Sequence, residues 1–267
     1  AYSYRKNSMP SQLYFYHSNG FPAETYGQLF EFLKDLETQR INVLGENIPS
    51  LNGSYDSLVQ EVIDHASSAK GDAIGVGHSL GATLCLLSKA KEPKIFRKVV
   101  LLDPPIFNPC KRFAVSILRK MGVEHLITPA GKAMKRRDVF NTREEAIDYF
   151  ENKTLFKNIS KRTIELYAEH GLVQKGNKFK LTISREREAE IFLNFPVSLP
   201  SNAFTVKGDL IYSEVNPLLS RIDLWWWKQS FPKVNLIPFP AGHLFPLEKP
   251  KELSDLLRTI LRKSLFK

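Results

Sequence analysis

Cysteine is scarce in this chain of 267 residues, in which only Cys85 and Cys110 occur. Cys85 lies in an apolar segment with a helical pattern, and Cys110 lies beside a proline, so the two residues form neither a disulfide framework nor a cluster of metal ligands. We expect both to be reduced thiols. The sequence predicts no metal site, and no cofactor is expected.

Long apolar runs are also missing. No stretch of about eighteen apolar residues occurs, so we expect no stable insertion into a membrane. The opening residues, AYSYRKNSMP, lack the apolar core of a signal peptide, which predicts a cytoplasmic protein. Because 43% of the residues are hydrophobic and 25% are charged, the chain can bury one substantial core.

Acidic residues are outnumbered, with 28 Asp and Glu against 38 Lys and Arg and a formal net charge of +10. The segment 111–190 holds 18 basic and 11 acidic residues, so it carries 18 − 11 = +7 of this charge. Its basic residues mostly alternate with acids and apolar residues, and no nucleic-acid motif accompanies them, so nucleic acid is not an expected partner. The one dense cluster holds Lys132, Lys135, Arg136 and Arg137, and it is either a solvated face or an attraction for an anionic substrate.

Apolar runs alternate with helical patterns over the first hundred residues. Strands are expected at residues 13–16, 41–44, 73–76 and 99–102, and again at 203–206 and 234–239, with helices near 24–37, 54–63, 80–88, 216–227 and 250–267. Because each strand is a continuous apolar run, the pattern predicts a doubly wound, mostly parallel sheet of the α/β class. Residues 105–199 carry helical patterns with one possible strand at 179–183. We therefore expect a core of residues 1–104 and 200–267 and a helical cap inserted at 105–199.

The segment 72–88 contains the pattern Gly77-His78-Ser79-Leu80-Gly81 between an apolar strand and an apolar helix. A G-x-S-x-G turn raises its serine onto a sharp strand-to-helix corner, and its two glycines avoid collisions with neighbouring backbone. The pattern alone also occurs in ordinary buried turns. Its context makes Ser79 our candidate nucleophile, with the side chain of His78 directed away from it.

A serine nucleophile needs a base and an acid that orients the base, at the carboxyl ends of other strands of the same sheet. Of the six histidines, only His243 follows the last expected strand. Two residues compete for the acid. Asp103 follows the strand next to the nucleophile strand and is held by two prolines, whereas Asp209 follows the expected strand 203–206. We favour Asp103 and keep Asp209 as the alternative.

Three motifs in this order, HSNGFP after the first strand, GHSLG, and GHLFPLE after the last strand, resemble the α/β-hydrolase family. The resemblance covers the chain from Leu13 to about Lys267 apart from the cap, but the short N-terminus leaves little room for two leading strands. The family more often places its acid after the next-to-last strand. In Gly208-Asp209-Leu210 the acid directly follows the glycine, without the two residues that usually separate them in this family, and this puts Asp209 in doubt.

The resemblance implies hydrolysis of a small-molecule ester or thioester through an acyl-enzyme. His243 would take the proton of Ser79, and backbone N–H groups would stabilise the oxyanion, by position those of Phe21 and Leu80. Similarity to peroxisomal-type lipases and acyl-CoA hydrolases is weaker and does not fix the substrate. Two alternatives stay open, a C–C bond hydrolase or lyase using the same residues, and a non-catalytic binding protein on the same scaffold. The oligomeric state is not predicted.

Overall fold

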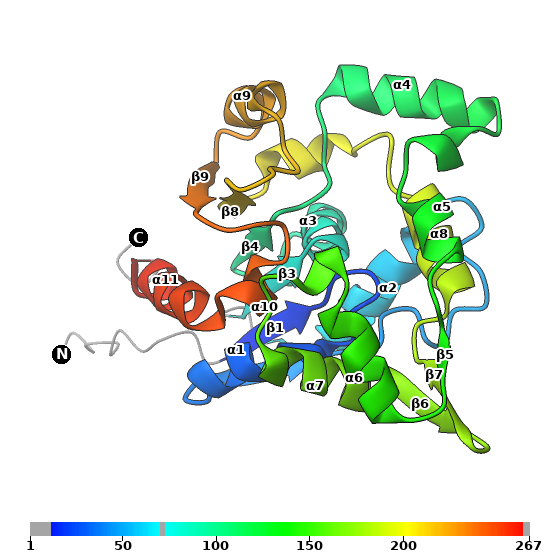
Figure 1. The fold of residues 1–267 in the computed structure, drawn as a ribbon. Helices are drawn as coiled ribbons and strands as arrows, with labels where there is room; N and C mark the ends of the chain where they lie inside the picture. The colour runs from blue at the N-terminus through cyan, green and yellow to red at the C-terminus, as the bar shows by residue number, and fades with distance from the viewer. Residues whose placement is uncertain (1–11, 70–72, 264–267) are drawn as a thin grey trace.

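The computed structural model describes residues 12–69 and 73–263. The opening residues 1–11, Asp72 and the last four residues of the expected C-terminal helix lie outside the described residues. A parallel six-stranded sheet forms the centre of the molecule, with the strand order β2-β1-β3-β4-β8-β9 (Figure 1). Its strands are β1 (Gln12–Tyr16), β2 (Glu37–Arg40), β3 (Ile74–His78), β4 (Lys98–Leu102), β8 (Gly208–Ser213) and β9 (Val234–Phe239). The predicted doubly wound α/β sheet is confirmed.

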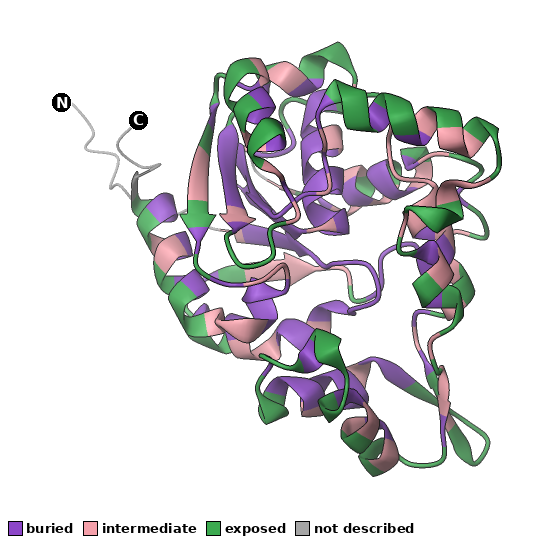
Figure 2. Ribbon diagram, turned by 45° about the horizontal axis from the view of Figure 1, so that its top comes forward, coloured by how far each residue is buried: buried purple, intermediate pink, exposed green. Residues whose placement is uncertain are grey.

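Helices cover both faces of this sheet, and its inner strands β1, β3, β4 and β8 are mostly buried, whereas the edge strands β2 and β9 are partly exposed (Figure 2). Successive strand residues point to opposite faces, so Leu13 and Phe15 belong to one apolar cluster while Tyr14 and Tyr16 belong to the other. The first cluster includes residues of α1 (Gly27–Phe32), α10 (Phe245–Glu248) and α11 (Pro250–Lys263). The second includes residues of α2 (Asp56–His65), α3 (Leu80–Lys91) and α9 (Arg221–Ser230).

Two expected strands are wrong. Residues 41–44 form a bend and turn, and the edge strand lies just before them, as β2, where the helix expected to reach residue 37 has already ended. Residues 203–206 fall mainly in a short 3-10 helix, η4 (Ser201–Thr205), and the strand begins afterwards, as β8. Asp209 therefore lies inside a strand near its amino end instead of following one.

The region 105–199 contains helices and a small antiparallel sheet of order β5-β7-β6. The expected strand at 179–183 is present as β7, and β5 and β6 were not expected. The elements are α4 (Pro109–Lys120), η2 (Glu124–Leu126), α5 (Ala130–Met134), β5 (Val139–Phe140), α6 (Arg143–Glu151), η3 (Thr154–Phe156), α7 (Lys161–His170), β6 (Leu172–Lys175), β7 (Lys178–Leu181) and α8 (Arg185–Leu193). Its division from the core as a separate cap stays a prediction.

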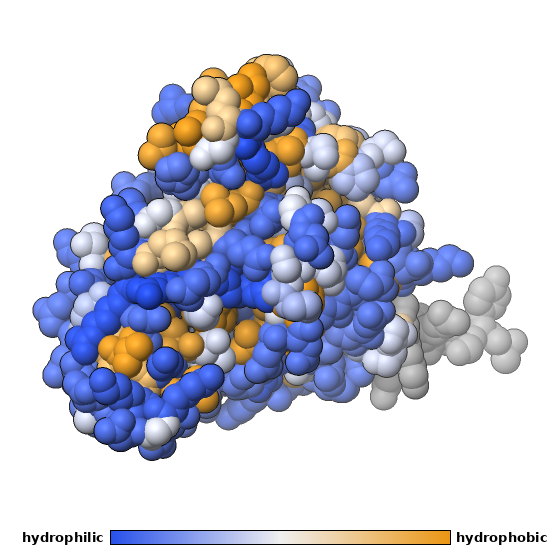
Figure 3. All heavy atoms as spheres, turned by 90° about the vertical axis from the view of Figure 1, so that its right-hand side faces the viewer, coloured by the Kyte–Doolittle hydropathy of each residue, from blue (hydrophilic) through white to orange (hydrophobic). Residues whose placement is uncertain are grey.

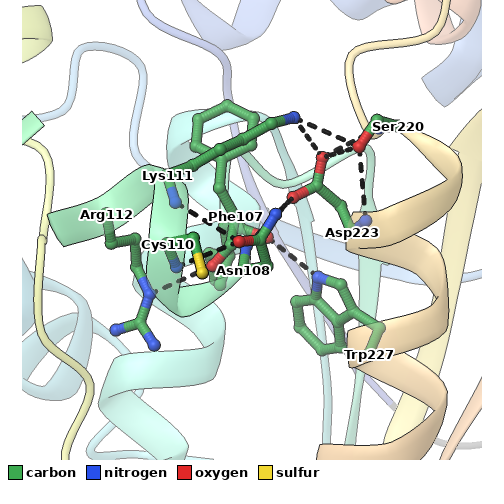
Figure 4. Close-up of polar contacts among 9 residues, drawn as sticks. Phe107, Asn108, Cys110, Lys111, Arg112, Ser220, Asp223 and Trp227 are labelled. Carbon is green, nitrogen blue, oxygen red and sulfur yellow. Dashed lines mark hydrogen bonds and ion pairs between the residues drawn. The ribbon is translucent and has the colours of Figure 1, made fainter. Parts of the chain in front are cut away.

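A buried polar network fixes the start of α4 to the start of α9 (Figure 4). The Asn108 side chain accepts hydrogen bonds from the first turn of α4, while its own N–H groups donate to Asp223 at 2.7 and 3.0 Å. Lys111 and Ser220 also donate to the Asp223 carboxylate. Burial alone would raise the pKa of Asp223, but these hydrogen bonds lower it to about 2. The junction after β4 is therefore rigidly held.

No helix in the described ranges is long and apolar enough to cross a lipid bilayer.

Candidate active site

Ser79 lies at the sharp corner between β3 and α3, with φ of 52° and ψ of −108°. Positive φ is costly for a residue other than glycine, on the order of 1–3 kcal/mol, so the surrounding structure must hold this conformation. A Cβ atom added to Gly77 would lie 2.2 Å from the backbone of Gly81, and one added to Gly81 would lie 2.0 Å from the carbonyl oxygen of Tyr16. The predicted reason for the two glycines, close backbone approach, is confirmed.

The structure brings Ser79, His243 and Asp103 together at the carboxyl end of the sheet. His243 Nε2 lies 3.1 Å from Ser79 Oγ, and His243 Nδ1 lies 2.7 Å from Asp103 Oδ2. An ionised carboxylate can only accept hydrogen bonds, so the imidazole proton is on Nδ1 and the Nε2 lone pair faces the serine hydroxyl. This is the proton arrangement that a serine nucleophile requires.

Asp103 is fully buried and sits just beyond β4 with a positive φ of 47°. Ser213, at the end of the neighbouring strand β8, donates its hydroxyl to Asp103 Oδ2 at 2.8 Å and its backbone N–H to Oδ1 at 3.2 Å. These bonds and the one from His243 satisfy the carboxylate and fix its direction. Sequence reasoning missed Ser213 because it placed the strand several residues too early; the apolar run Leu210-Ile211-Tyr212 was the available signal.

Asp209, the alternative acid, is not brought to His243. Its carboxylate lies 2.7 Å from Lys98 Nζ and accepts a hydrogen bond of 2.9 Å from Asn235. Lys98 begins β4 and Asp209 lies near the start of β8, so this buried pair is at the amino end of the sheet.

The two expected oxyanion donors differ in their surroundings. Leu80 is the first residue of α3, and no acceptor for its N–H is found in residues 12–69 and 73–263, as is usual for the first turn of a helix. The N–H of Phe21 donates to the carbonyl oxygen of Ser18 at 3.2 Å. Phe21 would have to leave this bond to bind a substrate oxygen.

His78 connects three parts of the site, although its side chain does not face Ser79. Its Nδ1 lies 2.7 Å from Tyr26 Oη, and its Nε2 lies 2.9 Å from the backbone oxygen of His243. Tyr26 Oη in turn accepts a hydrogen bond of 3.2 Å from the N–H of Ser18 in the first loop. Burial holds the pKa of His78 well below its usual value, so the ring is neutral and can accept at Nδ1 while it donates at Nε2.

His17 fixes the same loop from the other side. Its Nε2 accepts the N–H of Leu44 at 2.7 Å, and its Nδ1 donates to the carbonyl oxygen of Ser18 at 2.7 Å. Burial lowers the pKa of His17 from 6.5 to about 4, and the bond to Ser18 acts in the opposite direction. Neither His17 nor Tyr26 was singled out from the sequence, since contacts between separate loops leave no periodic pattern.

The chain belongs to the Alpha/beta hydrolase family, because a sequence model of that family matches residues 17–256. The resemblance stated from the three motifs is confirmed. An abhydrolase domain-containing protein of Schizosaccharomyces pombe is 26% identical over 215 residues, which cover 78% of this chain and 74% of that protein.

Solved structures share the fold at lower identity. E-2-(acetamidomethylene)succinate hydrolase is 20% identical with a TM-score of 0.70, and the match covers 94% of this chain and 91% of that one. The peroxisomal alpha-beta-hydrolase Lpx1 of Saccharomyces cerevisiae is 14% identical with a TM-score of 0.72, over 98% and 79% of the two chains. A thioesterase domain from the curacin biosynthetic pathway is 12% identical with a TM-score of 0.72, over 95% and 92%.

Proposed function

We propose that this chain is a serine hydrolase that cleaves an ester or thioester bond of a small molecule. The observation that carries the proposal is the continuous chain from Asp103 Oδ2 through the His243 ring to Ser79 Oγ, with contacts of 2.7 and 3.1 Å. In this assignment Ser79 is the nucleophile, His243 the general base and then the general acid, and Asp103 the residue that orients the imidazole.

The reaction would proceed in two steps. Ser79 Oγ attacks the carbonyl carbon while His243 Nε2 takes its proton, and the leaving alcohol or thiol receives that proton as the acyl-enzyme forms. A water molecule then repeats the sequence and releases the acid. The N–H of Leu80 is a suitable donor for the oxyanion because it begins a helix and has no acceptor in the described part of the chain. We keep Phe21 as the expected second donor.

The competing functions differ in what they require of the site. A binding protein on this scaffold would have no use for a serine held at positive φ beside a correctly oriented histidine, and this favours the enzyme. A C–C hydrolase or lyase would use the same three residues. We propose that residues 105–199 act as a cap that selects the substrate, which is why the core residues leave the acyl and leaving groups undefined.

A fluorophosphonate probe tests the nucleophile directly. Wild-type protein should be labelled on Ser79, and Ser79→Ala should not be labelled. Ser201→Ala is the control, because Ser201 is exposed in η4 and takes no part in the contacts of Asp103, His243 and Ser79, so this variant should be labelled as the wild type is. Labelling that persists in Ser79→Ala would contradict the assignment. A panel of p-nitrophenyl and coenzyme A esters, with β-diketones beside them, then separates ester and thioester cleavage from C–C cleavage.

A further inference from the structure

Large exposed apolar side chains gather around α4 and the segment that follows it. Within residues 113–134 they are Phe113, Ile117, Met121, Leu126, Ile127 and Met134, which we call the α4–α5 apolar patch. Leu126 is 73% exposed, Phe113 69% and Met121 67%. Figure 3 shows apolar atoms gathered at the top of this side of the molecule with hydrophilic atoms around them. An exposed apolar patch of this kind is typical of a binding surface.

Helix α4 differs from an ordinary surface helix in that it buries an arginine beside Val115 while large apolar side chains are exposed. Arg112 and Arg119 face the protein, where they donate to the carbonyl oxygens of Phe107 and Phe195 at 3.0 and 2.9 Å. Phe113, Ile117 and Met121, which recur every four residues, face solvent. Because the start of α4 is fixed to α9, this exposure is a stable property of the fold (Figure 4).

The charge around the patch is strongly one-sided. Residues 111–135 contain six Lys and Arg and a single acid, Glu124. Lys120, Lys132 and Lys135 are exposed, and no ion pair involves them within the described residues. An apolar surface bordered by lysines matches an anionic lipid bilayer, whose headgroups attract the lysines while its acyl region accepts the apolar side chains. A second copy of the chain would meet the same positive charge and be repelled.

We propose that the α4–α5 apolar patch docks the protein on the surface of an anionic lipid membrane. Beside the patch, an open cleft of about 450 Å³ lies between α5 and α8, lined by apolar residues such as Ala130, Met134 and Leu193 and also by Glu186 and Glu190. In α8 the residue before Ala189 is Glu188, whose backbone oxygen accepts a hydrogen bond of 2.9 Å from the side chain of Asn19. Docking would therefore place lipid beside the element that contacts the first loop of the candidate active site.

Vesicle co-sedimentation of the whole protein tests the proposal. The protein should bind phosphatidylcholine vesicles that contain phosphatidylglycerol and bind much less to phosphatidylcholine alone. Leu126→Ser should weaken binding by about tenfold, because a buried leucine side chain is lost from the interface. Leu155→Ser is the matched control: both leucines are exposed and lie in short 3-10 helices, but Leu155 is in η3, far along the chain from the patch.

Two double variants with reversed charges test whether the lysines contribute to vesicle binding. Lys120→Glu with Lys132→Glu should weaken binding to the anionic vesicles by about fivefold or more for each lysine, whereas Lys175→Glu with Lys178→Glu, on the β6–β7 hairpin, should leave it unchanged. Ser79→Ala should bind as the wild type does, so the assay is independent of hydrolysis. The proposal is overturned by absence of vesicle binding, by equal loss in the patch and control variants, or by a dimer that Leu126→Ser dissociates.

Discussion

Charged side chains are buried at both ends of the central sheet. At the amino end, Lys98 and Asp209 lie 2.7 Å apart, and each side chain is less than a tenth exposed. At the carboxyl end, the Asp103 side chain is fully buried, but its partner His243 is 32% exposed and leads on to Ser79. The Lys98–Asp209 pair lies wholly in the interior, whereas the Asp103–His243 pair connects a buried carboxylate to a partly exposed ring that contacts Ser79.

Backbone conformation separates the two ends further. Ser79 and Asp103, at the carboxyl end, both have positive φ, while Lys98, Asp209 and Asn235 do not. A strained backbone persists only where the neighbouring structure enforces it, and here the neighbours are the close glycine contacts and the bonds from Ser213. Burial of a carboxylate is therefore no guide to function by itself. What distinguishes Asp103 is that its partner His243 also contacts Ser79, the candidate nucleophile, which has a strained backbone.

The largest effects are expected at the carboxyl end. Ser79→Ala and His243→Ala should each lower kcat by about 10⁴ to 10⁶, and the double variant should be scarcely worse because the two residues act as a unit. Steady-state and single-turnover kinetics on the best ester measure this. Both variants should keep the wild-type melting temperature, since neither opens a large cavity. Losses that add in the double variant would contradict the assignment.

Exchanging the two acids for amides should give opposite results. Asp103→Asn should lower kcat roughly 10⁴-fold, because an amide permits the wrong imidazole tautomer. Asp209→Asn should change kcat less than about tenfold, because its carboxylate does not reach His243. It should instead lower the free energy of unfolding by about 3 kcal/mol, because Lys98 is left buried without its counter-ion.

Activity assays and urea unfolding on the same two samples decide this comparison. Lys98→Met with Asp209→Leu is a useful third variant, since replacing both charges with apolar groups should restore part of the lost stability. If Asp209→Asn were the inactive variant and Asp103→Asn the unstable one, the roles of the two sheet ends would be reversed.

The sharp corner at Ser79, the candidate nucleophile, was predictable because its signal is local. The Gly77–Gly81 spacing, an apolar run before it and an apolar helix after it all lie in one short segment, and His243 follows an apolar run of the same kind. The preference for Asp103 over Asp209 also came from the sequence, and Asp209 was a rival only because the strand before it was expected at 203–206, whereas β8 begins at Gly208. With the strand expected at 203–206, Asp209 appeared to follow its end; in the structure the residue at the end of β8 is Ser213.

Contacts between loops could not be predicted. Tyr26, His78 and the backbone of His243 meet only after the sheet has formed, and Ser213 reaches Asp103 only through strand pairing of β4 with β8. The exposure of the large apolar side chains of α4 could not be predicted for a related reason. Its apolar residues recur at helical spacing, which normally indicates a buried face, and only the packing of Arg112 and Arg119 shows which face is inside.

Acid should destabilise the carboxyl end through His17. Because the pKa of His17 is about 4 in the folded protein and 6.5 in its unperturbed form, the unfolded chain gains a proton first as the pH falls. The contribution of His17 to the free energy of unfolding is fully present above pH 6.5. It falls by about 3 kcal/mol in total as the pH drops from 6.5 to about 4. Burial shifts the pKa of His78 in the same direction and adds to this slope.

Urea unfolding across this pH range measures the slope. His17→Gln keeps an acceptor for the N–H of Leu44 but cannot titrate, so it should be less stable than wild type at neutral pH and show a flatter loss towards acid. His125→Gln is the matched control, because His125 is exposed and replacing it should leave the slope unchanged. An identical slope in wild type and His17→Gln would contradict the prediction.

The smallest effect is expected from the basic cluster, because two of its four positive charges are paired with carboxylates. Arg136 is paired with Glu188 and donates to Tyr167 at 2.9 Å, and Arg137 is paired with Glu145. Of the four basic residues of the cluster, Lys132 and Lys135 have no ion pair within the described residues. An attraction for anionic substrates would therefore depend on these two lysines.

Lys132→Glu with Lys135→Glu should raise KM for a coenzyme A ester several-fold at low salt and leave kcat unchanged, because the lysines act before the acylation step at Ser79. The difference from wild type should vanish as salt shortens the Debye length from about 10 Å at 0.1 M to about 3 Å at 1 M. A neutral p-nitrophenyl ester should respond to neither change. Lys175→Glu with Lys178→Glu removes the same charge from an exposed hairpin and serves as the control. If both double variants raised KM equally, the effect would come from net charge alone, and the cluster would be an ordinary solvated face.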